Sequence, residues 1–295
     1  MNKTAQDIFE QNRSRLIAIG YRMLGSRAEA EDCVQDAWLR LSTIDVKTLD
    51  SPAAWLTTTV SRLCLEALRA RKIRQETYVG PWLPEPWVDD PPAELPEVEA
   101  ELELADDLSM AFLLLLERLA QDERAAFLMH DVFEIEYPEI ATVIDKREDA
   151  VRQMVNRARK RIAEERPRFR ASQEQQKKLA EQFLKALLMH DAVELASLFR
   201  SEAVLVSDGG GKALAALRPI NGAQKIAKFF LGVTRDLKFD AVRVEIGWMN
   251  EGVSILVFDQ ESGPMMALGF DVRGEQIDGL YAVRNPDKLA RFHRT

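Results

Sequence analysis

Six prolines between positions 81 and 96 constrain the fold of this chain more than any other feature of its sequence. Because proline lacks a backbone N–H and its ring clashes with the preceding turn, a helix cannot run through this stretch. Apolar residues recur at helical spacing on both sides, from about Ile8 to Arg74 and from about Leu102 to Glu164. The prolines therefore predict a linker between two all-α modules.

The periodicity changes after about Glu174. One or two amphipathic helices lead into runs rich in Val, Ile and Phe, which turn residues separate and which are typical of strands. Helices followed by a curved antiparallel sheet indicate an α+β module. The sequence thus predicts a multidomain protein with two all-α modules and one α+β module. We place its parts at residues 1–76, 77–105, 106–170 and 171–295.

Composition favours a soluble globular protein, with 46% apolar and 30% charged residues. No apolar run approaches the roughly 20 residues that a membrane span needs, and the polar N-terminus lacks an apolar signal core. We therefore expect a cytoplasmic protein without a membrane partner. Cys33 and Cys64 lie at apolar helical positions without a CxxC or Cys/His neighbourhood, so we expect buried, reduced thiols, no metal and no cofactor.

The distribution of charge differs from the net charge of −8. Residues 152–170 hold eight basic and two acidic side chains, and residues 62–74 hold five and one. Residues 94–107 hold seven acidic side chains and no basic one. Two basic helix ends separated by an acidic stretch indicate two contacts with nucleic-acid phosphates, although a solvated face produces the same pattern.

Residues 136–162 form the strongest local motif. Pro138 is placed for a helix start, Asp145 to Glu148 form a polar turn, and a second helix follows. That helix presents apolar residues inward (Ala150, Val151, Met154, Val155) and polar residues outward (Arg152, Gln153, Asn156, Arg157, Arg159). This pattern is typical of a DNA-reading helix-turn-helix. An ordinary helical hairpin with a basic face also fits it.

Three segments carry a resemblance to a known family. "AEDCVQDAWLRL" (30–41) and "AAWLTTTVSRLCLEALRARK" (53–72) resemble region 2 of extracytoplasmic-function (ECF) sigma factors, and "YPEIATVIDKREDAVRQMVNRARKRI" (137–162) resembles their region 4. The motifs occur in the family's order and cover roughly the first 168 residues. The sequence departs from the pattern at Asp145, where glycine is common, at Lys146, where an apolar residue is common, and at Arg62, where asparagine is common.

The resemblance implies a subunit that binds RNA polymerase core, through its largest subunits, and recognises promoter DNA at the −10 and −35 elements. The residues implied for core binding share one helix face: Asp32, Gln35, Asp36 and Leu39. Those implied at the −10 element lie on the next helix: Trp55, Thr57, Thr58, Arg62, Arg69 and Arg71. Those implied at the −35 element lie in the helix-turn-helix: Arg147, Arg152, Gln153, Asn156, Arg157, Arg159 and Lys160.

Three further motifs resemble the sigma J-like group, whose C-terminal extension is a SnoaL-like, NTF2-type regulatory domain. The motifs are "WLPEP", "DGGGK" and "NPDKL". The implied regulatory residues are Trp82, Leu83, Pro84, Glu85, Pro86, Asp208, Gly209, Gly210, Gly211, Lys212, Asn285, Pro286, Asp287, Lys288 and Leu289. We expect the tryptophan motif to dock near "DGGGK", in a groove between region 2 and the C-terminal domain, and the domain to replace a separate anti-sigma factor.

Two alternatives stay open at the level of sequence. A helix-turn-helix regulator could bind duplex DNA without polymerase. The C-terminal domain could instead bind a ligand or act as an enzyme, since folds of this type also serve as isomerases. Such chemistry needs a base in an apolar cavity, and the candidates are Asp240, Asp259, Asp271 and Tyr281. We expect no enzyme activity.

Overall fold

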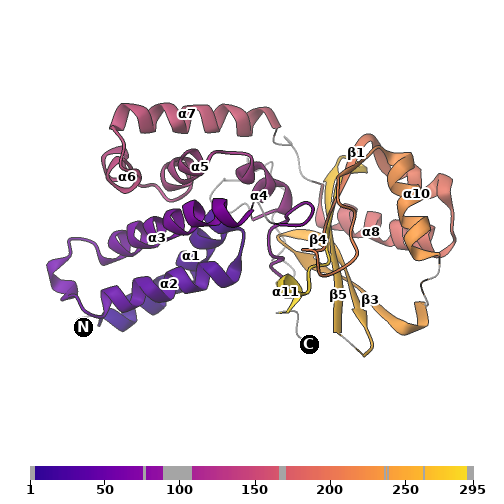
Figure 1. Cartoon of the computed structure of the whole chain (residues 1–295), viewed down its shortest axis with the longest axis horizontal. Coiled ribbons are helices and arrows are strands. Elements are labelled where there is room, and N and C mark those ends of the chain that lie inside the picture. Colours follow the sequence, from indigo (N-terminus) through magenta and orange to yellow (C-terminus); the bar gives the residue numbers. More distant parts are fainter. Residues whose placement is uncertain are drawn as a thin grey trace. The chain divides into compact units, whose positions relative to one another are not determined.

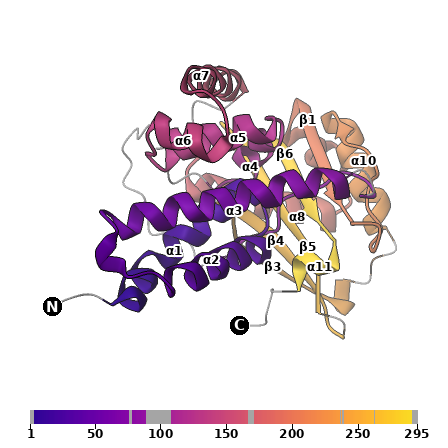
Figure 2. The ribbon, with the colours of Figure 1, turned by 60° about the vertical axis from the view of Figure 1, so that its left-hand side comes forward.

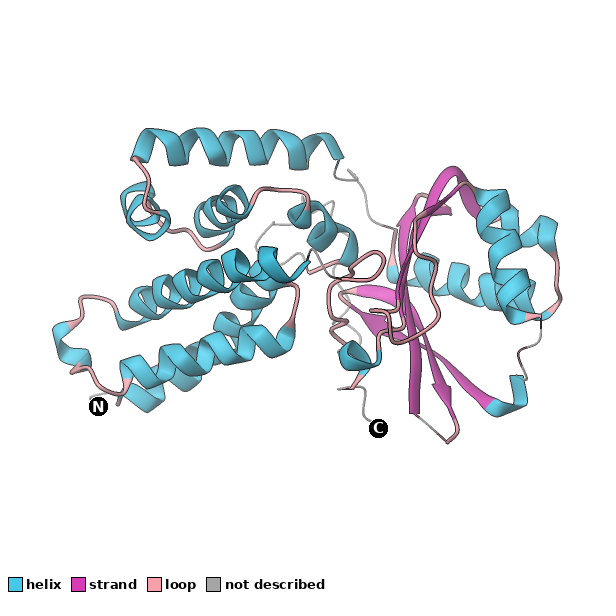
Figure 3. Ribbon diagram, viewed as in Figure 1, coloured by secondary structure: helices cyan, strands magenta, loops and turns pink. Residues whose placement is uncertain are grey.

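The computed structural model describes residues 4–75, 78–88, 108–165, 171–235, 237, 239–261 and 263–290. The chain forms two compact units. The first comprises Met1–Glu76, Ala100–Asp107 and Phe112–Arg166, and its described elements are helical. The second comprises Thr77–Glu99, Leu108–Ala111 and Pro167–Thr295, and it contains the sheet (Figure 3). No helix in the described part of the chain combines the length and apolar character needed to cross a membrane.

The first three helices of unit one pack together as a bundle (Figure 1 and Figure 2). They are α1 (Ala5–Leu24), α2 (Arg27–Leu41) and α3 (Pro52–Gln75). Gly25 ends α1 in the left-handed conformation, and the Ser26 hydroxyl then caps α2 by accepting from the backbone N–H of Glu29. A Cβ on Gly20 would lie 2.8 Å from the Cβ of Ala30, so glycine is what allows α1 to approach α2. Both cysteines are free and buried in this unit.

The helical module that contains the helix-turn-helix belongs to the same unit from Phe112 onward. Its elements are α4 (Met110–Glu117), α5 (Gln121–Phe127), a π-helical turn (Leu128–Val132), α6 (Tyr137–Ile144) and α7 (Glu148–Glu165), and the last two helices form the helix-turn-helix. Asp145 caps α6 in the left-handed conformation, with φ of 59°. Asp tolerates that conformation better than most residues, which explains how it stands where a glycine was expected. Glu148 begins α7, so the turn is one residue shorter than the sequence indicates.

Unit two begins with α8 (Gln173–Leu188) and α9 (Ala192–Ser197), and α10 (Ala223–Thr234) is inserted between its strands. The strands are β1 (Phe199–Asp208), β2 (Ile220–Asn221), β3 (Val242–Met249), β4 (Gly252–Asp259), β5 (Gly263–Arg273) and β6 (Gln276–Val283). The short helix α11 (Pro286–Leu289) follows. The sheet order is β2-β1-β6-β5-β4-β3. β1 pairs with β6 in parallel, which corrects the expectation of a purely antiparallel sheet.

The core of unit two lies between its helices and one face of the sheet. Phe183 of α8 makes edge-to-face contacts with Phe199, Phe230 and Phe270, at ring-centroid distances of 6.2, 5.1 and 5.5 Å. Such pairs add about 0.5–1.5 kcal/mol each beyond the area that they bury. The predicted fold class, two all-α modules and one α+β module, is confirmed.

Candidate functional site

The outward face of α2 carries the residues expected to bind polymerase. Asp32, Gln35, Asp36 and Leu39 are all exposed, while Cys33, Val34, Ala37 and Leu41 on the opposite face are buried. Leu39 is 54% exposed. The face therefore offers carboxylates, an amide and one apolar side chain together.

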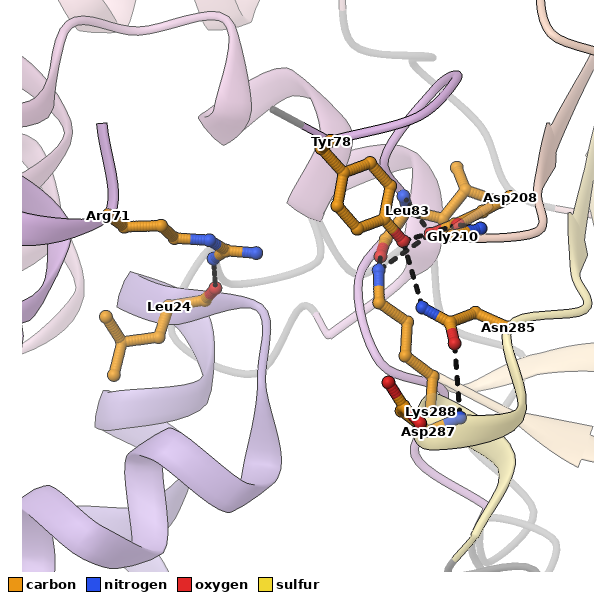
Figure 4. A network of polar contacts seen from close by, with 9 residues as sticks. All are labelled: Leu24, Arg71, Tyr78, Leu83, Asp208, Gly210, Asn285, Asp287 and Lys288. Carbon is orange, nitrogen blue, oxygen red and sulfur yellow. Dashed lines mark hydrogen bonds and ion pairs between the residues drawn. The ribbon is translucent and has the colours of Figure 1, made fainter. Parts of the chain in front are cut away.

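The residues of α3 expected at the −10 element differ in their exposure. Arg62 and Arg69 are exposed, whereas Trp55, Thr58 and Arg71 are partly buried. Thr57 is 5% exposed and its hydroxyl donates to the carbonyl of Ala53, so this side chain is not presented to solvent. Arg71 donates from Nη1 to the carbonyl of Leu24 at 2.6 Å (Figure 4).

Side chains of α3 also contact the helix-turn-helix bundle within unit one. Arg69 Nη2 lies 2.9 Å from Asp122 Oδ1 and 3.3 Å from the carbonyl oxygen of Ile144. The Thr58 hydroxyl donates to the Glu139 carboxylate. Two of the residues expected to contact −10 DNA therefore have protein partners here.

In a second set of contacts, side chains of the helix-turn-helix module donate hydrogen bonds to backbone carbonyls of the first helical bundle. Gln121 Nε2 donates to the carbonyl of Leu68 at 2.6 Å. Arg124, which is 2% exposed, donates from Nη2 to the carbonyl of Arg22 at 2.8 Å, and its Nη1 lies 2.5 Å from Glu117. The same region contains a polar cleft of about 630 Å³, which Arg69, Asp122 and Arg124 help to line.

Helix α7 presents the residues expected at the −35 element. Arg152, Gln153, Asn156, Arg157, Arg159 and Lys160 are all exposed, as is Arg147 in the preceding turn. Their apolar counterparts Val151 and Val155 are buried. The helix therefore has the two-sided character predicted for it.

Several arginines of this face form ion pairs within the module. Arg157 Nε lies 2.9 Å from Glu123 Oε1. Arg159 binds both carboxylate oxygens of Asp131, at 2.6 and 2.7 Å. This hydrogen-bonded carboxylate raises the pKa of the Arg159 guanidinium above its ordinary value.

A buried carboxylate joins the linker motif "WLPEP" to the two C-terminal motifs, "DGGGK" and "NPDKL". Asp208 is 0% exposed and accepts hydrogen bonds from the Leu83 N–H at 2.9 Å, the Tyr78 hydroxyl at 2.6 Å and the Gly210 N–H at 3.0 Å. Lys288 Nζ donates to the same carboxylate at 2.7 Å (Figure 4). Because a buried charge needs several partners, these four donors account for the carboxylate's position.

Lys288 and Asn285 of the "NPDKL" motif complete this cluster. Lys288 Nζ also donates to the carbonyl of Leu83, and it lies 4.2 Å from the centre of the Trp82 ring. Asn285 Nδ2 donates to the Tyr78 hydroxyl at 3.0 Å (Figure 4). We call Tyr78, Leu83, Asp208, Asn285 and Lys288 the Asp208 cluster. It attaches the linker to unit two.

The glycines of "DGGGK" allow the close approach of Asn285. Gly210 and Gly211 have φ of 58° and 72°, and a Cβ on Gly210 would lie 2.3 Å from Asn285 Nδ2. Lys212 lies 2.5 Å from Asp287, and both are more than half exposed. The two charged residues of this motif therefore differ, since Asp208 is buried and Lys212 lies at the surface.

The remaining motif residues pack on the same unit. Leu83, Pro84, Glu85, Pro86 and Leu289 are buried. Trp82 is partly buried, Gly209 lies beside Ala213 and Ala215, and Pro286 is exposed at the start of α11. "WLPEP" therefore contacts "NPDKL" and the start of "DGGGK".

A second attachment point was missed by the sequence analysis. In the β3–β4 turn, the Asn250 N–H donates to the carbonyl of Trp87 at 2.8 Å, and Asn250 Oδ1 accepts from the Trp87 N–H at 3.1 Å. Asn250 Nδ2 donates to the carbonyl of Leu108 at 3.1 Å, and Glu251 Oε2 accepts from the Leu108 N–H at 3.2 Å. This turn therefore holds both Trp87 and Leu108. The predicted acidic stretch 94–107 lies outside the described residues.

Comparisons with known proteins identify the family. The Sigma-70 region 2 family model matches residues 8–73, and the Sigma-70, region 4 model matches residues 109–162. The chain is 34% identical over 290 residues to the ECF RNA polymerase sigma factor SigJ of Mycobacterium tuberculosis (strain ATCC 25618 / H37Rv), covering 95% of this chain and 92% of that protein. The chain belongs to the ECF RNA polymerase sigma factors.

Further matches agree with this assignment. The crystal structure of Mycobacterium tuberculosis SigJ superposes with a TM-score of 0.74 and 31% identity, covering 96% of this chain and 97% of that one. The probable ECF sigma factor SigI of the same species is 34% identical over 159 residues, or 52% of this chain and 53% of SigI. Similarity to SigJ thus extends through the C-terminal α+β domain. As an ECF sigma factor, this protein directs RNA polymerase core to promoters, which decides against a regulator that acts without polymerase.

Proposed function

We propose that this ECF sigma factor contacts core polymerase through α2 and promoter DNA through α3 and α7, and that its own C-terminal domain controls these contacts. The observation that best supports this control is the Asp208 cluster, in which a buried carboxylate and Lys288 bind the linker at Leu83. Control of this kind needs no separate anti-sigma factor. The protein would act where RNA polymerase acts, in the cytoplasm.

The exposed face of α2 supports the polymerase contact. Asp32 and Asp36 suit a basic partner surface, and the exposed Leu39 supplies an apolar contact beside them. Interfaces of this composition gain specificity from charge and affinity from the buried apolar centre. The largest subunits of polymerase are the partners that the family resemblance implies.

The exposed cations of α3 and α7 support the two DNA contacts. In α7, Arg152, Gln153 and Asn156 have the donors and acceptors that read base edges in the major groove. Arg157, Arg159 and Lys160 suit phosphates. In α3, Arg62 and Arg69 are exposed, and Trp55 and Thr58 are partly so, which suits capture of a separated strand.

The contacts within unit one support a closed resting state. Arg69 and Thr58 cannot hold Asp122 and Glu139 and at the same time bind −10 DNA. Exposed ion pairs contribute only about 0–1 kcal/mol each, and Arg69 and Asp122 have side chains that are 43% and 27% exposed. We therefore propose that this closure is weak and that binding of polymerase reverses it.

The C-terminal domain supports control because it binds the connector between the two helical modules at both ends. The Asp208 cluster and the β3–β4 turn hold residues 78–87, and the same turn holds Leu108. While both ends are held, the length of chain between Trp87 and Leu108 adds nothing to the distance that the two modules can span. The proposed consequence is that the domain limits how far regions 2 and 4 can separate.

The interior of the C-terminal domain supports a protein-facing role over catalysis. Among the described residues, its core consists of apolar side chains, with Phe183 packed against three other phenylalanines. Of the candidate catalytic residues, Asp240 is exposed, and Asp259, Asp271 and Tyr281 are partly buried outside that core. We propose a regulatory domain that is not an enzyme. A turnover screen with a panel of small ketones and epoxides would contradict this if any were converted.

Run-off transcription with core polymerase tests the control. The template is the DNA upstream of the protein's own gene, and the variants are a truncation after Arg284, which removes "NPDKL", and Trp82→Ala. A truncation after Ala290 is the matched control, because it keeps the Asp208 cluster. We expect several-fold more transcript from the first truncation and from Trp82→Ala than from the control. Equal output from the three variants and the full-length protein would refute intramolecular control, whereas a loss of output would assign the domain to activation.

A further inference from the structure

Tyr137, the first residue of α6, contacts helix α7 through Arg152, although it is not among the residues expected to contact DNA. The Cζ atom of Arg152 lies 4.2 Å from the centre of the Tyr137 ring. On the same ring, the imidazole of His130 lies at a centroid distance of 3.9 Å with an interplanar angle of 32°. His130 is itself fixed, since its Nδ1 lies 3.1 Å from the carbonyl oxygen of Ile135. The tyrosine ring therefore links the turn before α6 to α7.

A second arginine of α7 is held in the same region. The Arg159 guanidinium binds Asp131, whose side chain is only 7% exposed. Arg159 lies seven residues after Arg152, which is two helical turns along the same face of α7. Tyr137 itself is held by its ring, between His130 and Arg152.

The contacts of Arg152 leave one edge of its guanidinium open. Both Nε, at 3.1 Å, and Nη2, at 2.5 Å, donate to the same oxygen of Glu148. In the part of the chain that the structure describes, Nη1 makes no such contact. The end of the guanidinium formed by Nη1 and the second hydrogen of Nη2 is therefore available for two parallel hydrogen bonds. That is the edge with which arginine pairs with guanine O6 and N7.

We propose that Tyr137 is a positioning residue for −35 recognition, which fixes the plane of the Arg152 guanidinium for base reading. The inference rests on the proposed assignment of α7 to −35 DNA. Glu148 sets the direction of the side chain, and the ring contact restricts rotation of its planar end. A side chain held in its binding geometry loses less conformational entropy when it binds. Bidentate recognition depends on this plane, whereas a phosphate contact does not.

The test measures base preference with reconstituted holoenzyme and full-length variants. Holoenzyme selects from a duplex pool with randomised promoter positions, the bound DNA is sequenced, and affinities are then measured on the selected sequence and on its −35 variants. The variants are Arg152→Ala, Tyr137→Phe, Tyr137→Leu, Tyr137→Met and the double variant Tyr137→Leu/Arg152→Ala. Tyr137→Phe keeps the ring and is the matched control. Two replacements without a ring are used so that one unstable variant does not decide the result.

Arg152→Ala is expected to reduce discrimination at its base pair by about tenfold or more, as for a bidentate contact. Tyr137→Leu and Tyr137→Met should reduce discrimination at the same base pair by about threefold, the size of an exposed cation–π contact. Tyr137→Phe should retain it. The double variant should discriminate no less than Arg152→Ala alone, because the tyrosine acts only through the arginine.

Each other outcome overturns a specific statement. If Arg152→Ala leaves the selected −35 sequence unchanged, the assignment of α7 fails, and the role of Tyr137 fails with it. If Arg152→Ala changes that sequence but the variants without a ring do not, only the role of Tyr137 is overturned. Equal loss of affinity on all sequences would show that Tyr137 is merely structural, and so would an additive double variant.

Discussion

Replacing Lys288 with methionine tests the ion pair at the centre of the Asp208 cluster. Lys288→Met keeps most of the side chain's length but removes its charge. The carboxylate that it leaves is 0% exposed, and the lysine itself is 12% exposed, so water cannot readily replace the ammonium group. Breaking one partner of such a pair costs about 3–5 kcal/mol.

The remaining contacts place the expected cost near the lower end of this range. Asp208 keeps three donors, from Tyr78, Leu83 and Gly210, so its charge is only partly uncompensated. Loss of the cation–π contact with Trp82, at 4.2 Å, adds about 0.5–1 kcal/mol. We expect the linker to detach more easily by about 3 kcal/mol, or roughly a hundredfold in the opening equilibrium.

Hydrogen exchange at the Leu83 amide measures this opening, because that N–H donates directly to Asp208 Oδ2. Lys212→Met is the matched control. Lys212 pairs with Asp287 in the same motifs, but their side chains are 56% and 63% exposed, so its loss should cost no more than about 1 kcal/mol. In an Asp208→Asn background, Lys288→Met should cost about 2 kcal/mol less than in the intact protein. Equal protection of Leu83 in Lys288→Met and Lys212→Met would refute the reasoning.

Three further predictions concern other parts of the chain. Asp122→Asn should weaken the contacts with Arg69 and Lys146 by about 1 kcal/mol. Energy transfer between fluorescent labels on α3 and α7 should therefore fall, and unchanged transfer would show that these ion pairs do not hold the two helices together. Phe183→Ala should lower the free energy of unfolding of the C-terminal unit by about 3–5 kcal/mol in urea; a change below about 1 kcal/mol would contradict its central place in the core. Arg157→Ala should weaken promoter binding on all sequences and lower the salt slope by about one; a changed −35 preference at constant slope would reverse its assignment from phosphate to base.

The helix-turn-helix was predictable because its signals are local. Pro138 at the helix start and the buried Val151 and Val155 follow from spacing within a few residues. The turn departs from the family pattern, since Asp145 stands where glycine is common, but its left-handed conformation satisfies the same backbone requirement. Local pattern also distinguished the helical modules from the α+β module.

The contacts that the Asp208 cluster and the β3–β4 turn make with the linker could not be predicted in detail, because they join residues far apart in the chain. The sequence marks Asp208 only as the first residue of "DGGGK", and only the folded chain brings Lys288, Tyr78 and the Leu83 N–H around it. The parallel pairing of β1 with β6 is non-local in the same way. Asn250 gave one weak signal, a turn residue between two strand-like runs, but nothing in the sequence indicates that its side chain bridges Trp87 and Leu108.

The usable length of the connector between the helical modules depends on whether the β3–β4 turn binds Trp87 and Leu108. Asn250 and Glu251, with φ of 52° and 59°, form a tight turn. Its polar groups make hydrogen bonds to Trp87 and to Leu108. About twenty residues lie between those positions, and a chain of that length spans up to about 70 Å when fully extended. When both residues are hydrogen-bonded to the turn, this length does not contribute to the distance that the two helical modules can span. Releasing Leu108 adds reach without changing any side chain expected to contact DNA, whereas releasing Trp87 alone does not, because the Asp208 cluster still holds Tyr78 and Leu83. We therefore expect the hydrogen bonds to Leu108 to affect which promoter spacings the protein can bridge.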